Sequence, residues 1–388
     1  MSIFPPQLRI PGPAPLPERV IRAMCQPMID HRGPEFAALL EEVVRGAKTV
    51  FGTDHDVIVL SSSGTGGLES AIANLVSPGD RVLSAICGNF GERFAEIASV
   101  YGAQVIRHEV EWGQPVDPDD LRRLLAAHPE VELVLLTHNE TSTGLTNDLE
   151  ALVAVVREAG RLSVVDGVSS VSSMPVEVDR IGADVVVSGS QKGWMAPPGI
   201  AFAAVSEPAW ERQATSKSPR FYFDWAQHRK FASRGATPWT PAVSVMFGVR
   251  EGIRMLLEEG LDNAYARHRR CADAVGAGLQ GMGFDLLAAE GYRSATVTAA
   301  LPRAELDIKA YRKLLREKFG VVIAGGQGKM DGRMIRVGHL GYVTEGDMIQ
   351  VLWAMEQALE ELDVRANEGA GVSAAVASLN QAAAAVPA

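Results

Sequence analysis

The sequence has few cysteines, and their spacing argues against two kinds of site. Among 388 residues only Cys25, Cys87 and Cys271 are cysteine, and no two of them form a C-x-x-C pair. Neither a disulfide framework nor a cysteine-ligated zinc site is therefore indicated. The eight histidines include no H-E-x-x-H motif, so we expect no metal site. Three isolated thiols fit a reducing compartment, and we expect a cytoplasmic protein.

Long apolar runs and an excess of basic residues are also missing. There is no apolar run of about 18 residues, so we expect no membrane-spanning helix and no membrane partner. The opening stretch MSIFPPQLRIPGPAPLPERV lacks a basic segment followed by an apolar one, so no secretory signal is expected. The formal net charge of −10 argues against a nucleic-acid partner. The 47% of hydrophobic residues is sufficient for a well-buried core.

Between Val57 and Val205, short β-branched runs alternate with amphipathic stretches. Strands are predicted at Val57–Leu60, Arg81–Ala85, Val131–Leu136, Leu162–Val165, Asp184–Val187 and Ile200–Val205. Helices are predicted at Leu68–Leu75, Phe90–Val100 and Leu149–Ala159, where apolar residues recur at helical spacing. This alternation predicts an α/β domain with a mostly parallel sheet and helices on both faces. Ligands of such sheets bind beyond the carboxyl ends of the strands.

A smaller α+β unit is predicted beyond Pro241. Its helices are expected at Val243–Leu257, Ala264–Leu279, Leu306–Lys318 and Glu345–Leu362, and its strands at Ala295–Ala300, near Val321 and at Met334–Val337. The predicted organisation is an N-terminal arm (1–18), a large domain (19–242), a long connecting helix with a small C-terminal domain (243–365) and a tail (366–388). The tail is rich in Ala and Gly, and we expect a frayed or weakly helical end.

A Gly- and Ser-rich turn lies between the first predicted strand and its helix, in VIVLSSSGTGGLESAIANL (Val57–Leu75). Backbone amides at the helix N-terminus, with the hydroxyls of Ser63 and Thr65, would bind a phosphate group. The alternative is a tight turn without a ligand. The turn is not a dinucleotide fingerprint, because Glu69 stands where the third glycine belongs, and no Gly-Lys-Ser/Thr closes a Walker A loop.

Asp166 and Lys192 follow two later strands. Asp166 ends an apolar run, where it either caps a helix or holds a cationic ligand atom, because an unpaired buried carboxylate is costly. Lys192 follows Val185–Val187 and either extends to solvent or is desolvated, which makes an amine a better nucleophile and Schiff-base former. A phosphate cradle, a carboxylate and a lysine at one edge of a sheet are together what a pyridoxal phosphate site requires.

The sequence resembles the class V aminotransferases, specifically the alanine–glyoxylate and serine–glyoxylate branch. GSQKGWMAPPG (Gly189–Gly199) carries the resemblance most specifically, and SSGTGGLE (Ser62–Glu69) and THNETSTG (Thr137–Gly144) occur in the family's order and spacing. The likeness extends from PGPAPLPERV near the start to IRVGHLG (Ile335–Gly341). It implies the pyridoxal phosphate-dependent fold type I, with a mostly parallel sheet of the seven-stranded type in the large domain and a smaller α+β C-terminal domain.

The resemblance implies a role for each matching position. Lys192 is expected to form the Schiff base and to move the substrate proton, Asp166 to pair with the pyridine nitrogen, and Arg336 to bind the substrate carboxylate. The positions expected to contact the cofactor are Ser63, Gly64, Thr65, Phe90, Thr141, Asp166, Gln191, Lys192 and Thr240. Of these, Phe90 matches the residue that stacks on the ring, and Thr141 one near the phenolic oxygen.

The resemblance also implies a homodimer whose active sites lie at the subunit interface. Thr240, in RGATPWTPAVS (Arg234–Ser244), matches a threonine that family members contribute to the phosphate site of the neighbouring subunit. Three residues earlier some relatives have a tyrosine, and this chain has Thr237. The phosphate contact across the interface is therefore expected to differ in detail.

The implied reaction is pyridoxal phosphate-dependent transamination between a small amino acid, alanine or serine, and a 2-oxo acid, glyoxylate or pyruvate. Two alternatives keep the fold and the cofactor: another amino donor, such as aspartate, an aminophosphonate or ureidoglycine, or a subunit without catalytic activity. A desulfurase would need a mobile cysteine in the C-terminal domain, and Cys271 lies in a helical pattern.

Overall fold

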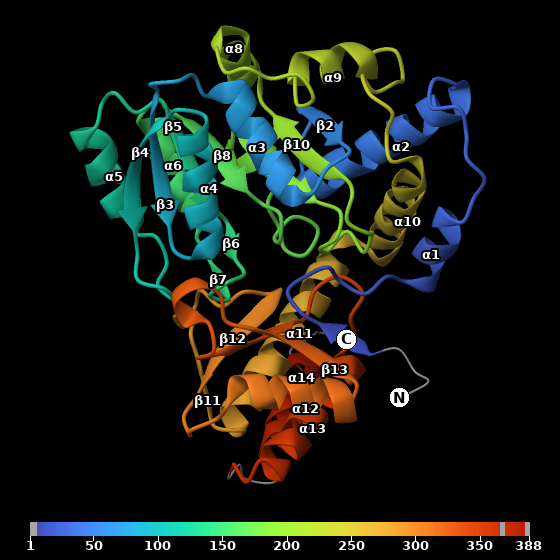
Figure 1. Cartoon of the computed structure of the whole chain (residues 1–388), viewed down its shortest axis with the longest axis vertical. Helices are drawn as coiled ribbons and strands as arrows, with labels where there is room; N and C mark the ends of the chain where they lie inside the picture. Colours follow the sequence, from blue (N-terminus) through green and yellow to red (C-terminus); the bar gives the residue numbers. More distant parts are fainter. Residues whose placement is uncertain (1–5, 365–368, 385–388) are drawn as a thin grey trace.

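The computed structural model describes residues 6–364 and 369–384 and contains one large and one smaller β-sheet (Figure 1). The seven strands of the large sheet have the order β2–β10–β9–β8–β5–β3–β4. They are β2 (Asp56–Leu60), β3 (Arg81–Ile86), β4 (Gln104–Glu109), β5 (Leu133–Thr137), β8 (Leu162–Asp166), β9 (Val185–Gly189) and β10 (Ala201–Val205). Strand β10 runs antiparallel to both of its neighbours, β2 and β9, and the other neighbouring pairs of the sheet are parallel. The predicted α/β fold with a mostly parallel sheet is confirmed.

Helices cover both faces of the large sheet. They are α1 (Glu18–Met24), α2 (Pro34–Phe51), α3 (Gly64–Leu75), α4 (Asn89–Val100), α5 (Pro118–Ala127), α6 (Leu149–Glu158), α7 (Val178–Ile181), α8 (Glu207–Thr215) and α9 (Trp225–Ala232). The valine run of β9 is buried on both faces, since Val186 packs in one hydrophobic cluster and Val185 and Val187 pack in another. Alternating side chains of a strand point to opposite faces, so this strand can only lie inside the sheet.

Strand β4 and six of the helices beside the large sheet, α1, α2, α5, α7, α8 and α9, were not predicted from the sequence. Strand β4, QVIRHE, carries charged residues because it lies at the edge of the sheet and is partly exposed. Helix α2 has recognisable end signals, with Pro34 in its first turn and Gly52 after its last residue at φ +64°. Proline at the start and a left-handed glycine at the end are typical of helices.

The smaller sheet has five strands in the order β1–β13–β14–β12–β11. They are β1 (Gln7–Arg9), β11 (Phe284–Leu286), β12 (Val297–Pro302), β13 (Val321–Gly325) and β14 (Ile335–Gly338). The helices of this part are α10 (Val243–Glu259), which leads into it, α11 (Leu261–Gly281), α12 (Ile308–Lys318), α13 (Glu345–Glu361) and α14 (Ala370–Ala384), with a short 3₁₀ turn at Gly328–Met330. Strand β1 comes from the other end of the sequence and pairs in parallel with β13.

The Ala-rich tail, expected to be a frayed or weakly helical end, forms the helix α14 over Ala370–Ala384. Glu356 of α13 accepts hydrogen bonds from the backbone N–H groups of Gly371 and Val372, at 2.6 and 3.3 Å. On α11, a Cβ at Gly278 or Gly281 would lie within 3.2 Å of the backbone of Gly371 or Ala370. Glycines on one helix therefore allow the close approach of the other. The remainder of the tail lies outside the described residues.

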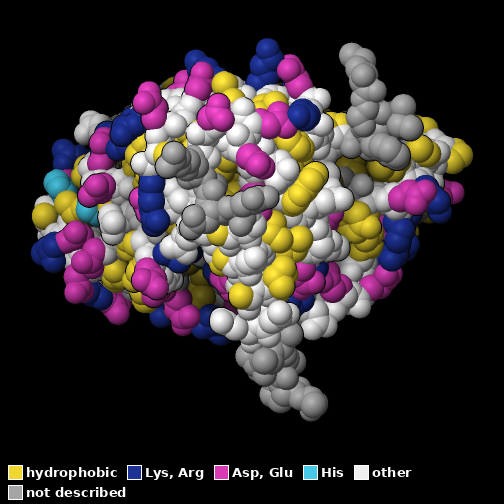
Figure 2. All heavy atoms as spheres, turned by 90° about the horizontal axis from the view of Figure 1, so that it is seen from below, with side chains coloured by type: hydrophobic (Ala, Val, Ile, Leu, Met, Phe, Trp, Pro, Cys, Tyr) yellow, Lys and Arg dark blue, Asp and Glu magenta, His cyan; other side chains and the backbone are white. Residues whose placement is uncertain are grey.

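Within the described ranges, no helix combines the length and the hydropathy needed to cross a membrane. Figure 2 shows basic and acidic side chains interspersed on the face seen from below Figure 1. This face differs from the continuous basic surface that is typical of nucleic-acid binding.

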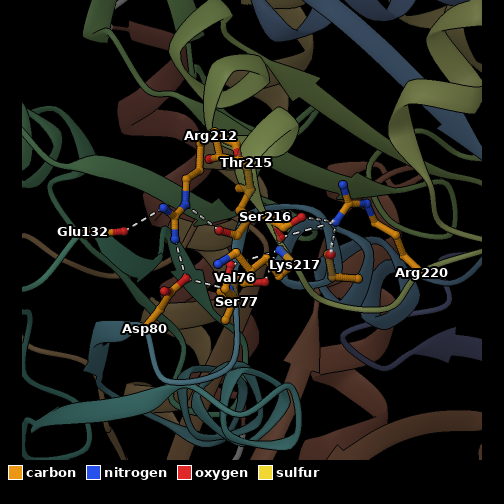
Figure 3. Close-up of polar contacts among 11 residues, drawn as sticks. Val76, Ser77, Asp80, Glu132, Arg212, Thr215, Ser216, Lys217 and Arg220 are labelled. Carbon is orange, nitrogen blue, oxygen red and sulfur yellow. Dashed lines mark hydrogen bonds and ion pairs between the residues drawn. The ribbon is translucent and has the colours of Figure 1, made fainter.

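A largely buried arginine connects α8 to the end of α3 and to the loops beside the large sheet (Figure 3). Arg212 Nε donates to the carbonyl oxygen of Leu75 at 2.8 Å, and its guanidinium pairs with the carboxylates of Asp80 and of Glu132, the latter at 2.8 Å. The Arg212 side chain is 20% exposed. Arg220, later in the same segment, donates to main-chain carbonyl oxygens. These contacts fix the segment that follows α8.

We expect Arg212→Ala to lower the free energy of unfolding by about 2 kcal/mol, because it leaves a half-buried carboxylate and a carbonyl without their donor. Arg212→Lys keeps the charge but not the fork of donors, and we expect an intermediate loss. Urea denaturation measures both. As a control, Arg180→Ala removes exposed ion pairs with Glu150 and Glu177 and should change stability little. Equal effects at the two arginines would contradict this assignment.

Candidate active site

The loops at the carboxyl ends of the parallel strands surround one cavity of about 120 Å³. It is lined by Gly64, Thr65, Leu68, Phe90, Arg93, Asn139, Thr141, Asp166, Val168, Ser169, Gln191 and Lys192. All the predicted site residues except Ser63, Thr240 and Arg336 are among them. A larger cavity of about 830 Å³ lies beside α2 and contains none of the predicted residues. The predicted residues therefore identify the smaller cavity as the candidate active site.

The turn before α3 leaves the first amides of that helix open. Ser63 is the N-cap residue, and its side-chain oxygen accepts the N–H of Gly66 at 3.3 Å. Ser63 and Thr65 are exposed. At Gly64 a Cβ would lie 2.7 Å from Cγ1 of Val168, so only glycine fits. Amides and hydroxyls at a helix N-terminus favour an anion such as a phosphate group.

Lys192 is partly buried, and its amine hydrogen bonds within the protein rather than extending into solvent. Its Nζ donates to the carbonyl oxygen of Pro11 at 2.5 Å. Burial lowers the pKa of Lys192 to about 8; nearby Asp166 raises the pKa, and Arg336 and Arg93 lower it. Since an ordinary lysine has a pKa near 10.5, the uncharged amine is populated at much lower pH here. The uncharged form is the one that attacks a carbonyl carbon.

The N-terminal segment covers this lysine. Gly12, at φ +136°, lies so close that a Cβ there would be 2.6 Å from Nζ of Lys192. Two residues later, Ala14 donates its N–H to the carbonyl oxygen of Gln191 at 2.8 Å. Strand β1 thus leads directly from the small sheet to the lysine. No pattern in the sequence indicates this contact, because β1 pairs with residues more than 300 positions away.

Asp166 ends β8 and faces the same cavity. Its Oδ1 accepts the N–H of Val168 at 2.9 Å. Burial raises the pKa of Asp166 to about 6, with an additional upward contribution from Glu140, while the Val168 N–H, Lys192 and Arg93 lower it. A buried carboxylate of this kind favours a positive ligand atom beside it, because a cation restores the stability of the charged form.

Arg336 extends from β14 of the small sheet to Thr141 at the wall of the cavity, although it does not line the cavity itself. Its guanidinium donates to the carbonyl oxygens of Gly325 and Thr141, at 2.8 and 3.0 Å, and to Oε1 of Gln327 at 3.2 Å. Burial lowers the pKa of Arg336 to about 10, and Glu140 partly offsets this. The hydrogen-bond partners are all neutral, so the positive charge is available to a carboxylate ligand.

Gln191 retains unused hydrogen-bonding capacity, because its Oε1 is buried without a partner among the described residues. Thr240 is exposed and does not line the cavity of its own chain. Three polar lining residues, Arg93, Asn139 and Ser169, were not predicted from the sequence. Two of them had a local signal: Arg93 follows Phe90 by three residues on α4, and Asn139 precedes Thr141 by two on an extended segment.

Cys271, the candidate thiol of a desulfurase, is fully buried inside α11. Burial raises its pKa to about 12, so the thiol is held in its neutral form. A nucleophilic cysteine requires the thiolate and access to substrate. The buried position of Cys271 provides neither the thiolate nor access to substrate.

The comparisons with known proteins agree with this site. The model of the family Aminotransferase class-V matches residues 8–339. The chain is 41% identical to the soluble hydrogenase 42 kDa subunit of Anabaena cylindrica, over 95% of this chain and 97% of that protein. It is 34% identical to serine–glyoxylate aminotransferase of Methylorubrum extorquens, over 96% of each. Pyridoxamine–pyruvate aminotransferase of Mesorhizobium loti has the same fold, with a TM-score of 0.94 and 30% identity over 98% of this chain and 99% of that one.

The family match covers both sheets and the lysine between them. Class V aminotransferases use pyridoxal 5′-phosphate, and the cavity offers groups that suit it: open amides at α3, a buried carboxylate and a desolvated lysine. The chain therefore belongs to the class V aminotransferases and is a pyridoxal phosphate-dependent enzyme.

Proposed function

We propose that the enzyme transfers the amino group of a small amino acid, alanine or serine, to a 2-oxo acid, glyoxylate or pyruvate. The observation that carries the proposal is that Lys192 and Asp166 line one cavity while Arg336 donates to Thr141 at its wall. The relatives support the acceptor, since one is named for glyoxylate and another for pyruvate. The name of the Methylorubrum relative, serine–glyoxylate aminotransferase, also supports serine as donor.

In this proposal each residue has one task. Bound pyridoxal phosphate supplies the electron sink and the carbon that accepts the amino group. Lys192 Nζ removes the proton from the substrate Cα and later returns it, which its pKa of about 8 suits near neutral pH. Asp166 keeps positive charge at the ring nitrogen. Arg336 binds the substrate carboxylate and so fixes the direction of the Cα–H bond.

The phosphate group is assigned to the first turn of α3. Ser63, Gly64 and Thr65 offer amides and hydroxyls there. The family's pattern assigns the side-chain NH₂ group of Gln191 to the same phosphate group. By the family's pattern, Phe90 is assigned to stack on the ring and Thr141 to lie near its phenolic oxygen. These assignments account for the sequence-predicted contacts within one chain.

We infer that a second copy of the chain completes the site with Thr240. Beside Thr240, the ring of Trp239 stacks on Phe221 with centroids 4.6 Å apart, and Phe221 is 76% exposed. Tyr222, in the same cluster, is 43% exposed. Exposed aromatic rings that stack on one another favour a protein interface over a free surface.

The cytoplasmic location expected from the sequence stays a prediction.

A second candidate function is a subunit role without catalysis, which is favoured by the name of the Anabaena relative. Such a protein would bind the cofactor but would not react with amino acids. Desolvation of Lys192 argues against it, because a buried amine costs stability and nothing in a purely structural role requires that cost.

The proposal predicts that alanine or serine, added alone, bleaches the visible absorbance band of the purified enzyme, because the amino group moves to the cofactor. Glyoxylate or pyruvate should then restore the band. Absorbance spectroscopy with a panel of donors that includes aspartate, an aminophosphonate and ureidoglycine measures the preference. Lys192→Ala should lack the original band and lose more than about 1,000-fold in turnover, since it removes nucleophile and base together. Lys313→Ala, on the exposed face of α12, is the matched control.

Three other outcomes would change the conclusion. A band that no donor bleaches would support the subunit role. Bleaching by aspartate in preference to alanine and serine would reassign the donor. An unchanged band and normal turnover in Lys192→Ala would show that the lysine was wrongly assigned.

Arg336→Lys should raise KM for the amino donor by about 10- to 100-fold and change kcat less, because lysine cannot form the bidentate pair with a carboxylate. Steady-state kinetics with saturating acceptor measures both constants. Arg312→Lys, a nearby arginine that hydrogen bonds to the carbonyl oxygen of Ile323, is a control for general changes in the small sheet. Equal kinetic effects at both positions would contradict a specific carboxylate site at Arg336.

The shared site predicts complementation between two defective chains. In a purified heterodimer of Lys192→Ala and Thr240→Ala chains, one site combines an intact Lys192 with the intact Thr240 of the other chain. That heterodimer should show about half of the wild-type activity, although both parent homodimers are impaired. Two affinity tags allow its purification after co-expression. Activity no higher than that of the Thr240→Ala homodimer would place Thr240 in the site of its own chain or outside both sites.

A further inference from the structure

Glu140 is a buried carboxylate to which none of the roles above is assigned. It belongs to β6 (Asn139–Glu140), which forms a short hairpin with β7 (Leu145–Thr146), and it is 0% exposed. Its neighbours Asn139 and Thr141 line the active-site cavity. Because side chains alternate along an extended segment, Glu140 points the other way, toward α4.

The carboxylate accepts the first amides of α4. Oε2 of Glu140 accepts the N–H groups of Phe90 and Gly91, at 3.0 and 3.1 Å. Oε1 accepts the N–H and the hydroxyl of Ser142, at 3.0 and 2.6 Å. The Ser142 hydroxyl oxygen in turn accepts the N–H of Asn89 at 2.9 Å. The N–H groups of Asn89, Phe90 and Gly91 cannot find a partner within the helix, because they belong to its first turn. They donate instead to the side chains of Glu140 and Ser142 in the hairpin.

The residue that would normally cap α4 is a glycine without a side chain. Gly88 is the N-cap residue, and no side-chain cap bond is present there. A Cβ at Gly88 would lie 2.4 Å from Cγ of Glu140 and 2.5 Å from Oγ of Ser142. Glycine is therefore required for the hairpin to approach. The absence of a side chain at Gly88 thus leaves room for Glu140 and Ser142, which cap α4 from a distant part of the sequence.

Although its side chain points toward α4, the charge of Glu140 influences residues of the active site. Burial raises the pKa of Glu140, and the four hydrogen bonds it accepts oppose this by stabilising the carboxylate. The positive end of the α4 dipole stabilises it further. Its negative charge raises the pKa of both Arg336 and Asp166. Glu140 thus influences the substrate-binding guanidinium as well as the helix that carries Phe90.

We propose that Glu140 is a positioning residue of the active site, which holds the first turn of α4 and thereby fixes the ring of Phe90 against the cofactor. The proposal rests on the stacking role assigned to Phe90 under the proposed function. Phe90 is bonded to the carboxylate through its own N–H, and the guanidinium of Arg93 lies over its ring with Cζ 4.8 Å from the centroid. Without the carboxylate, the buried amides lose a charged acceptor, so the ring is held less firmly.

A double-mutant cycle tests this directly. Cofactor-free wild type, Glu140→Gln, Phe90→Ala and the double variant are titrated with pyridoxal 5′-phosphate, and the visible absorbance band gives the dissociation constant. Glutamine keeps the size of the side chain and one acceptor oxygen but not the charge. We expect Glu140→Gln to weaken binding about tenfold in the wild-type background and less than about twofold in Phe90→Ala. The visible circular dichroism of the bound cofactor should change in the same pattern, because it reports the ring's surroundings.

Two further variants separate positioning from general stability. Asp307→Asn removes the charge of an exposed carboxylate that caps α12 by accepting the N–H groups of Lys309 and Ala310, and it should lower the melting temperature without changing cofactor affinity. Ser142→Ala removes one donor to Glu140 and the acceptor for Asn89, so it should weaken binding by about threefold with the same dependence on Phe90. If Glu140→Gln fails to fold, Ser142→Ala takes its place in the double-mutant cycle with Phe90→Ala.

Equal losses in the wild-type and Phe90→Ala backgrounds, or unchanged affinity in Glu140→Gln, would overturn the proposal while leaving the proposed function intact. If Phe90→Ala itself changes neither affinity nor circular dichroism, the stacking assignment fails and the role of Glu140 fails with it. If no variant binds cofactor, including the Asp307→Asn control, the proposed function is in error instead.

Discussion

Desolvation of Lys192 is the constraint on which the site depends. An ammonium group is unfavourable where water is excluded, so the amine gives up its proton more readily there than at the surface. Two structural features produce the exclusion. Lys192 follows the buried valine run of β9, a strand inside the large sheet. The N-terminal segment covers the lysine through Pro11 and Gly12. Neither feature contributes a reactive group, but together they hold the pKa of Lys192 below that of an ordinary lysine.

The cover also connects the two sheets. Strand β1 is hydrogen bonded to β13 of the small sheet, and a few residues later the same segment contacts Lys192 at the edge of the large one. Arg336 makes a second connection, from β14 to the carbonyl oxygen of Thr141. The amine of Lys192 and the guanidinium of Arg336 are therefore positioned by contacts that cross from one sheet to the other.

Local patterns predicted the fold and the residues at the strand ends, and they failed where structure depends on distant pairing. The β-branched runs and Gly-rich turns located the cavity because each strand end is a local feature. Strand β1 has only three residues and no pattern of its own, so its place in the small sheet follows from β13 alone. Glu140 lies within a motif that carries the family resemblance, but its role has no local signal, since its cap bonds reach 50 residues back to α4. The role of Thr240 cannot be derived from one chain.

The charges around the cavity explain why an enzyme maintains so unfavourable an arrangement. Lys192, Asp166 and Arg336 form their hydrogen bonds with neutral backbone or amide groups, and they act on one another only through longer-range electrostatic interactions. Buried charges without close partners destabilise a protein, and a ligand that carries a phosphate, a cationic ring atom and a carboxylate removes the cost. Binding energy and folding energy are therefore linked at this site. Glu140 differs from these three because the amides of α4 already satisfy one of its carboxylate oxygens.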